Sequence, residues 1–96
     1  MAEFTVTSSE LRNKANELSN LNNRYKQEIE NLVAEENALK SMWEGEAKEA
    51  FTQAFNRDKA KMEAFYSAIQ DYISKLNAIA AQYDASERQN VATAGS

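Results

Sequence analysis

The chain has 96 residues, of which 43% are hydrophobic and 27% charged, with a net charge of -4 and no proline, histidine or cysteine. This composition is typical of a folded helical protein, and the missing residue types exclude disulfides, a cysteine nucleophile, an imidazole base and the common zinc ligands. The acidic balance argues against nucleic acid as a partner, because phosphate binding needs an uncompensated basic surface.

The first ten residues, MAEFTVTSSE, contain neither a basic segment nor an apolar run. A cleavable signal peptide needs both, with an apolar run of about 7 to 15 residues, so we do not expect one here. No window approaches the roughly 18 uninterrupted apolar residues of a membrane-spanning helix, so we expect no stable membrane insertion.

A first helix is predicted over residues 8–40. Thr7 and Glu10 have the spacing of a capping box, which marks a helix start. An apolar series with a seven-residue period follows: Leu11, Leu18, Tyr25, Leu32 and Leu39. Ala15 and Ile29 lie four residues after members of this series, and such alternation of four and three residues predicts a seam against another helix. Asn22 and Glu36 fall on the secondary stripe and weaken it; we expect them to face a rim or a partner and at most to set the register of the helices.

A second helix is predicted over residues 46–87, followed by a flexible tail over 88–96. It carries two apolar series: Phe55, Met62, Ile69, Leu76 and Tyr83, and also Phe51, Phe65, Tyr72 and Ile79, with Asp58 interrupting the second. A helix with only one neighbour would not need so broad an apolar stripe, so we expect contacts with more than one helix.

The two periodic segments are separated by a short stretch, 41–45, that contains Trp43 and Gly45. A connection of this length favours an antiparallel helical hairpin, and folding the chain about residues 43 and 44 places Tyr25 opposite Met62. Glycine permits a positive φ at the turn. Trp43 has two interpretations: its indole fills the end of the hairpin, or it is a contact point for another protein.

The predicted fold is therefore all-α: a single domain, residues 1–96, in which an antiparallel two-helix hairpin dimerises into a four-helix bundle. The partner is a second copy of the chain or a related hairpin protein. The residues expected in the core or dimer seam are Leu11, Leu18, Tyr25, Ile29, Leu32, Phe51, Phe55, Met62, Phe65, Ile69, Tyr72 and Leu76.

The tripeptide Trp43-Glu44-Gly45, midway between two amphipathic helices, resembles the signature of the Trp-x-Gly (WXG) family of early-secreted-antigen-like proteins. A second family signature, a Tyr followed four residues later by Asp or Glu, matches Tyr83 and Glu87. The resemblance covers nearly the whole chain. It implies a homodimeric, virulence-associated protein of a Gram-positive bacterium, secreted through a type VII (ESX-like) system as an effector or escort. It also implies that Tyr83 and Glu87 form part of an export signal read by the secretion ATPase.

Two other functions compete with this one. The same amphipathic pattern fits an intracellular helical adaptor or assembly module with no role in secretion. An enzyme that uses Glu35 and Glu36 is disfavoured, because adjacent residues on a helix point about 100° apart and form no acid–base pair. We expect no enzymatic activity, no cofactor and no metal.

Overall fold

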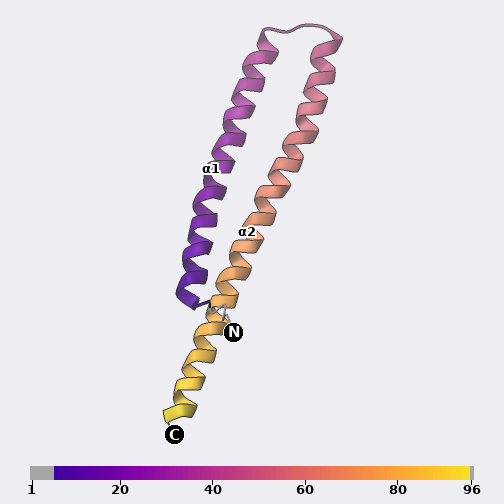
Figure 1. Ribbon diagram of the computed structural model, residues 1–96. Helices are drawn as coiled ribbons and strands as arrows, with labels where there is room; N and C mark the ends of the chain where they lie inside the picture. Colours follow the sequence, from indigo (N-terminus) through magenta and orange to yellow (C-terminus); the bar gives the residue numbers. More distant parts are fainter. Residues whose placement is uncertain (1–5, 96) are drawn as a thin grey trace, which may run out of the picture.

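The computed structural model describes residues 6–95, with side chains described as far as Ser86. Two helices make up this part of the chain: α1 spans Ser8–Ser41 and α2 spans Glu46–Gly95. They run antiparallel, with the turn between them at one end of a rod (Figure 1). The predicted all-α hairpin is confirmed, whereas the assignment of the whole chain to one domain stays a prediction.

The rod is long and thin, with extents of 77 × 25 × 17 Å and a radius of gyration of 21.8 Å. A compact chain of this length would have a radius of gyration of about 12 Å. Two helices side by side bury one stripe of each and leave the remaining surface open. Accordingly, Ala15, Ile29 and Ala80 are the only hydrophobic residues that are buried among those described.

The start of α1 follows from the predicted cap. Thr7 has extended backbone angles, φ -90° and ψ 158°, and its hydroxyl accepts a hydrogen bond from the Glu10 N–H at 3.1 Å. The Leu11 N–H donates to the Thr7 carbonyl at 3.1 Å, which closes the first helical turn. A capping side chain of this kind typically contributes about 1 kcal/mol to helix stability.

The end of α2 differs from the prediction. The helix was expected to stop at residue 87, but it continues to Gly95. Residues 88–94 contain neither proline nor glycine and include two alanines, so no residue in this segment breaks the helical backbone. The side chains from Glu87 onward lie outside the described residues.

The seam between the helices follows a different stripe of α1 from the one that the leucines suggest. The buried positions of α1 recur every seven residues: Ser8, Ala15, Asn22, Ile29 and Glu36. Asn22 and Glu36 are only 3% and 6% exposed, whereas Leu32 is 46% exposed. Of the two environments expected for these polar residues, a rim or a partner, neither residue takes the rim, because both are buried in the seam.

Asn22 is tolerated in the seam because its amide is hydrogen-bonded. Its Nδ2 donates to the Tyr66 carbonyl at 3.1 Å and to the Gln70 Oε1 at 3.0 Å. A buried polar group that finds specific partners on a neighbouring helix favours one relative position of the two helices over others. Asn22 therefore sets the register of the hairpin.

This register is offset from the predicted one. Tyr25 was expected opposite Met62, but its ring meets Phe65 edge to face, with centroids 5.7 Å apart. The offset of three residues is close to one helical turn. At the open end of the hairpin, an Arg12 guanidinium nitrogen donates to an Asp84 carboxylate oxygen and links the two helices.

Candidate functional site

Trp43 closes the turn end of the hairpin. Its indole is half-buried, and the ring centroid lies 5.4 Å from that of Phe51. Phe51 stacks in turn on Phe55 at 6.4 Å. The Trp43 N–H donates to the Lys40 carbonyl at 3.3 Å, so the backbone is held as well as the ring. Trp43 thus packs against the end of the hairpin while part of its indole remains accessible to another molecule.

Gly45 supplies the backbone conformation that starts α2. Its φ is 103°, in the region that side chains disfavour, and its carbonyl accepts the Lys48 N–H at 3.1 Å. A Cβ built at this position would meet no atom within 4 Å. Glycine is therefore required by the backbone angle and not by a lack of space.

One side of the rod is apolar along its length, and we call it the apolar face. Ten of its residues line grooves between the two helices: Leu18, Leu21, Tyr25, Leu32, Leu39, Met42, Phe51, Phe55, Phe65 and Ile69. Tyr72, Ile79 and Tyr83 continue the seven-residue series of Phe65 and Ile69 along α2 and are assigned to the same face. Several are large and open to solvent, including Leu21 at 55%, Phe65 at 56% and Tyr72 at 54% exposed. Exposed apolar side chains grouped in this way are typical of surfaces that bind another protein.

Two grooves between the helices connect the residues of the apolar face. One, of about 210 Å³, is lined by Leu18, Leu21, Asn22, Tyr25, Phe65 and Ile69. The other lies near the turn, measures about 360 Å³, and is lined by Leu32, Glu35, Glu36, Ala38, Leu39, Met42, Phe51 and Phe55. Because each groove takes side chains from α1 and α2, the apolar stripes of the two helices lie on the same side of the hairpin.

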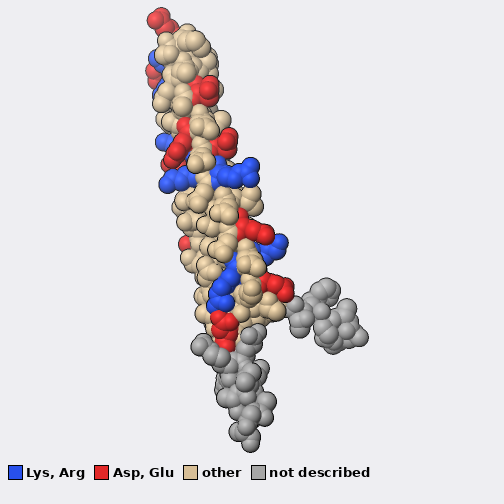
Figure 2. All heavy atoms as spheres, turned by 90° about the vertical axis from the view of Figure 1, so that its left-hand side faces the viewer, with Lys and Arg blue, Asp and Glu red and all other residues tan. Residues whose placement is uncertain are grey.

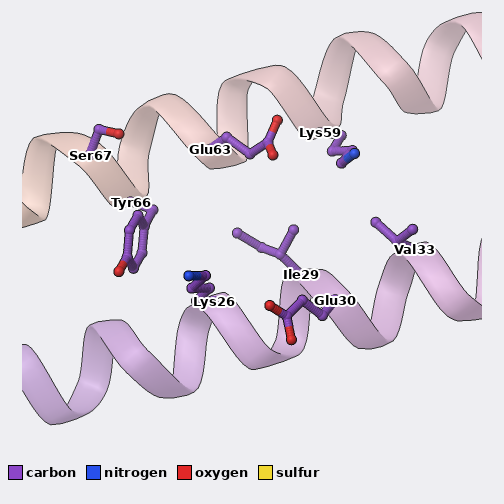
Figure 3. A pocket seen from close by; sticks show the side chains of 8 residues that line it. All are labelled: Lys26, Ile29, Glu30, Val33, Lys59, Glu63, Tyr66 and Ser67. Carbon is purple, nitrogen blue, oxygen red and sulfur yellow. The ribbon is translucent and has the colours of Figure 1, made fainter.

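A second surface, the charged groove, has the opposite character. It measures about 460 Å³ and is lined by Lys26, Ile29, Glu30, Val33, Lys59, Glu63, Tyr66 and Ser67 (Figure 3). Each helix contributes one lysine and one glutamate, and the Lys26 Nζ lies 5.6 Å from the centre of the Tyr66 ring. The balanced charges give this groove no preference for an anion or a cation.

The outer surface of the rod also mixes charges. In the view of Figure 2, basic and acidic side chains are interspersed along the molecule and form no large patch of one sign. A protein that binds nucleic acid carries clustered Lys and Arg on the binding face, and the face in this view lacks such a cluster. Among the described residues, no helix is long and apolar enough to span a membrane.

The two adjacent glutamates of α1 have different environments. Glu35 is exposed, whereas the Glu36 side chain is 5% exposed and its Oε2 lies 3.4 Å from the Lys40 Nζ. The Oε1 of Glu36 is buried and has no hydrogen-bond partner. The described residues contain no group of three or more His, Cys, Asp or Glu side chains placed to hold a metal ion.

The predicted motif residues do not meet within one chain. Trp43 and Gly45 lie at the turn, whereas Tyr83, which is 41% exposed, lies far along α2 from that turn. The adjacent Asp84 pairs with Arg12, so this part of α2 lies beside the first turns of α1. The helix from Glu46 to Tyr83 is continuous and about 55 Å long. Glu87 can be placed only as a residue of α2, since its side chain lies outside the described residues.

The seam residues chosen from the sequence divide between the hairpin interior and the open face. Ile29 is buried; Leu32, Phe65 and Tyr72 are exposed in the single chain; and the other members are half-buried: Leu11, Leu18, Tyr25, Phe51, Phe55, Met62, Ile69 and Leu76. Leu21 and Met42 also belong to the apolar face but were not predicted. Leu21 and Met42 are 21 residues apart, which is three seven-residue repeats, and this spacing was the only sequence signal that could have assigned them to the apolar face.

The chain is similar to a known protein family and to solved structures. The family model described as "Proteins of 100 residues with WXG" matches residues 3–88. Among solved structures, a crystal structure of the secreted protein EsxB from Bacillus anthracis strain Sterne is 24% identical, with a TM-score of 0.79 over 91% of this chain and 99% of that one. The wild-type EsxB structure in another crystal form is 25% identical, with a TM-score of 0.77 over 86% and 89% of the two chains. No curated protein matches the chain.

The fold, the turn and the family model agree. Residues 3–88 include the capped first helix, the turn with Trp43 and Gly45, and α2 as far as Tyr83 and beyond. The matched segment covers most of the 96 residues. This chain belongs to the WXG100 family.

Proposed function

We propose that this chain is a small, non-enzymatic protein exported by a bacterial type VII (ESX-like) secretion system, and that it acts as a secreted effector or escort through contacts with other proteins. The observation that carries the proposal is the open apolar face on a WXG hairpin. The fold likeness to EsxB, which is described as a secreted protein, supports the route of export.

The exposed area supports an obligate partner. The accessible surface of the chain is 7476 Å² for a mass of 10.8 kDa. A compact monomer of this mass would expose about 5,500 Å². The excess, about 1,900 Å², is within the area that each subunit of an obligate dimer buries.

The proposed assembly is a four-helix bundle made by two hairpins that cover each other's apolar faces. A second copy of the chain is the simplest partner, because its own apolar face has the same length and composition and could pack on this one. A related hairpin protein would satisfy the same surface. In either assembly the charged groove stays open to solvent, because it lies on the opposite side of the rod.

The proposed export signal combines the turn of one hairpin with the C-terminal motif of the other. Trp43 and Tyr83 lie at opposite ends of one chain, so a single surface of the secretion ATPase could not contact both. If two hairpins pack antiparallel, Trp43 of one copy lies beside Tyr83 and Glu87 of the other. The partly exposed indole and the 41% exposed Tyr83 side chain are both available for such contact.

The test is release into the medium. A tagged chain is expressed in a bacterium that has a type VII system and in a strain of it that lacks the secretion ATPase. We expect the protein in the medium of the first strain only, with a cytoplasmic protein as the lysis control. Equal release from both strains would contradict export by this route.

The alternative function is an intracellular helical adaptor. The same apolar face favours it, since a helical bundle is a common assembly module. Retention of the tagged chain in the lysate of the strain with an active ATPase, together with a stable complex with another cellular protein, would support the adaptor instead.

A further inference from the structure

Asp84, the residue after Tyr83, links the C-terminal part of α2 to α1. Its carboxylate accepts a hydrogen bond from the Arg12 guanidinium, which is 72 residues away in the chain. Among the residues whose side chains are described, this is the only ion pair that joins the two helices, since the other two pairs lie within α1. This link between the helices therefore lies beside a residue of the proposed export signal.

The pair lies close to the end of the segment of α2 that α1 accompanies. Ala15 and Ala80 are completely buried, and each lies about one helical turn from the pair toward the middle of the rod. In the other direction, α1 begins at Ser8, only one turn before Arg12, and α2 continues beyond the start of α1 (Figure 1). Beyond the pair, α2 thus has little further support from α1.

Fixing Asp84 also fixes the directions of its neighbours on α2. Successive residues of an α-helix point about 100° apart, whereas residues four apart point the same way to within about 40°. By position, Tyr83 and Glu87 therefore share one stripe of the helix, next to the stripe of Asp84. When Asp84 is held against α1, this neighbouring stripe is turned away from the seam, in agreement with the 41% exposure of Tyr83.

Apolar packing determines this rotation of α2 only weakly. Ala15 and Ala80 are the buried hydrophobic residues nearest the pair, and a methyl group offers little shape to resist rotation of a helix. The amide of Asn22 also bonds to α2, but it lies about 15 Å along α1 from Arg12. A hydrogen bond between a guanidinium and a carboxylate is directional as well as strong, so it selects one rotation where small side chains do not.

We propose that Arg12 is a positioning residue of the export signal: through its bond to Asp84, it holds α2 in the rotation that presents Tyr83 and Glu87 to the secretion machinery. Arg12 itself makes no contact with that machinery. The inference rests on the proposed function, and it adds to the C-terminal motif a residue from the other end of the sequence.

Secretion of charge variants tests the positioning. Arg12→Gln should lower ATPase-dependent release about threefold, which is the size of effect that an exposed ion pair has on an equilibrium. Arg12→Glu adds repulsion between two carboxylates and should lower release further, about tenfold. Arg12→Lys keeps the charge and should retain most of the release. The matched control is Lys14→Glu, the same reversal of charge at a lysine that is 72% exposed and pairs only with Glu17 of its own helix. Its release should equal that of the wild type.

Exchange of the two charges separates positioning from direct recognition. Asp84→Lys alone should lower release as Arg12→Glu does. The double variant should return to within about twofold of the wild type, because the ion pair forms again with its charges exchanged. Secretion machinery that bound Arg12 or Asp84 directly would reject the double variant as well.

A measurement on the purified protein separates positioning from folding. The Arg12→Gln protein should have the helical content of the wild type by circular dichroism. Its amide hydrogen exchange should be about threefold faster around Asp84, where the bond is lost, and unchanged around Gln70, which Asn22 holds.

The outcomes separate this inference from the function on which it rests. Equal release of the wild type from strains with and without the ATPase would overturn the proposed export and the inference together. ATPase-dependent release of the wild type, with equal release of Arg12→Glu, would leave export standing and overturn the role of Arg12. A double variant that fails to recover would mean direct recognition of the pair, and loss of helical content in Arg12→Gln would mean a structural role. Either result would overturn positioning.

Discussion

Replacing Phe65 with alanine should separate the stability of the hairpin from that of the dimer. Phe65 is 56% exposed in the single chain, where its ring contacts Tyr25. A phenylalanine buries about 200 Å² when fully covered, so a partner would cover about 110 Å² at this site. At about 25 cal/mol per Å², and allowing for the area that alanine keeps, the loss is about 2 kcal/mol per copy.

Each dimer contains two such sites, so the Phe65→Ala dimer should be about 4 kcal/mol weaker, which raises its Kd about a thousandfold. Sedimentation over a range of concentrations measures this change, and circular dichroism verifies that the chain remains helical. Val33→Ala is the control, because Val33 is an apolar residue of the charged groove on the opposite side. Unchanged association of the Phe65 variant would refute the assignment of the apolar face to a second copy.

Three further changes test other parts of the structure. Asn22→Ala removes the amide that bonds to α2 and should lower the free energy of unfolding by about 1 to 3 kcal/mol in urea titrations, whereas Asn23→Ala, at an exposed neighbouring position, should change it by less than about 0.5 kcal/mol. Gly45→Ala should cost about 1 kcal/mol in the same titrations through its positive φ alone, and an unchanged midpoint would mean that the turn adopts another conformation. Tyr83→Ala and Trp43→Ala proteins should each fold yet fail to reach the medium. Their co-expression should restore part of the secretion, because a mixed dimer keeps one intact composite site. If mixed dimers form in the cell but never reach the medium, one intact site is not sufficient for export.

The sequence predicts the helices well because their signals are local. Thr7 and Glu10 mark the start of α1, and the repeated apolar residues continue until the turn. The end of α2 was harder to predict, since residues 88–94 favour no particular structure strongly and the polar composition suggested a tail. A stretch without proline or glycine can continue a helix that is already formed.

The sequence could not show which stripe of α1 faces α2, because the leucine series and the series with Asn22 and Glu36 have the same seven-residue period. The leucine series looks like the seam, yet the stripe with Asn22 and Glu36 faces α2. The polarity of Asn22 argued against burial, and its acceptors, the Tyr66 carbonyl and Gln70, lie more than 40 residues away in the chain. The favourable environment of Asn22 exists only after the hairpin has formed, so no local pattern could reveal it.

Because the interior of the hairpin is small, we expect its stability to depend on the protein concentration as well as on contacts within the chain. With Ala15, Ile29 and Ala80 as the only buried hydrophobic residues among those described, a single hairpin leaves much of its apolar surface in water. In the proposed dimer, that surface is covered only when two hairpins meet. Folding and association are then linked by mass action, and each tenfold dilution weakens the assembled state by about 1.4 kcal/mol. The melting temperature should therefore rise with protein concentration. A dimer that leaves a crowded cell for a large external volume would be driven toward single hairpins, each with its apolar face uncovered.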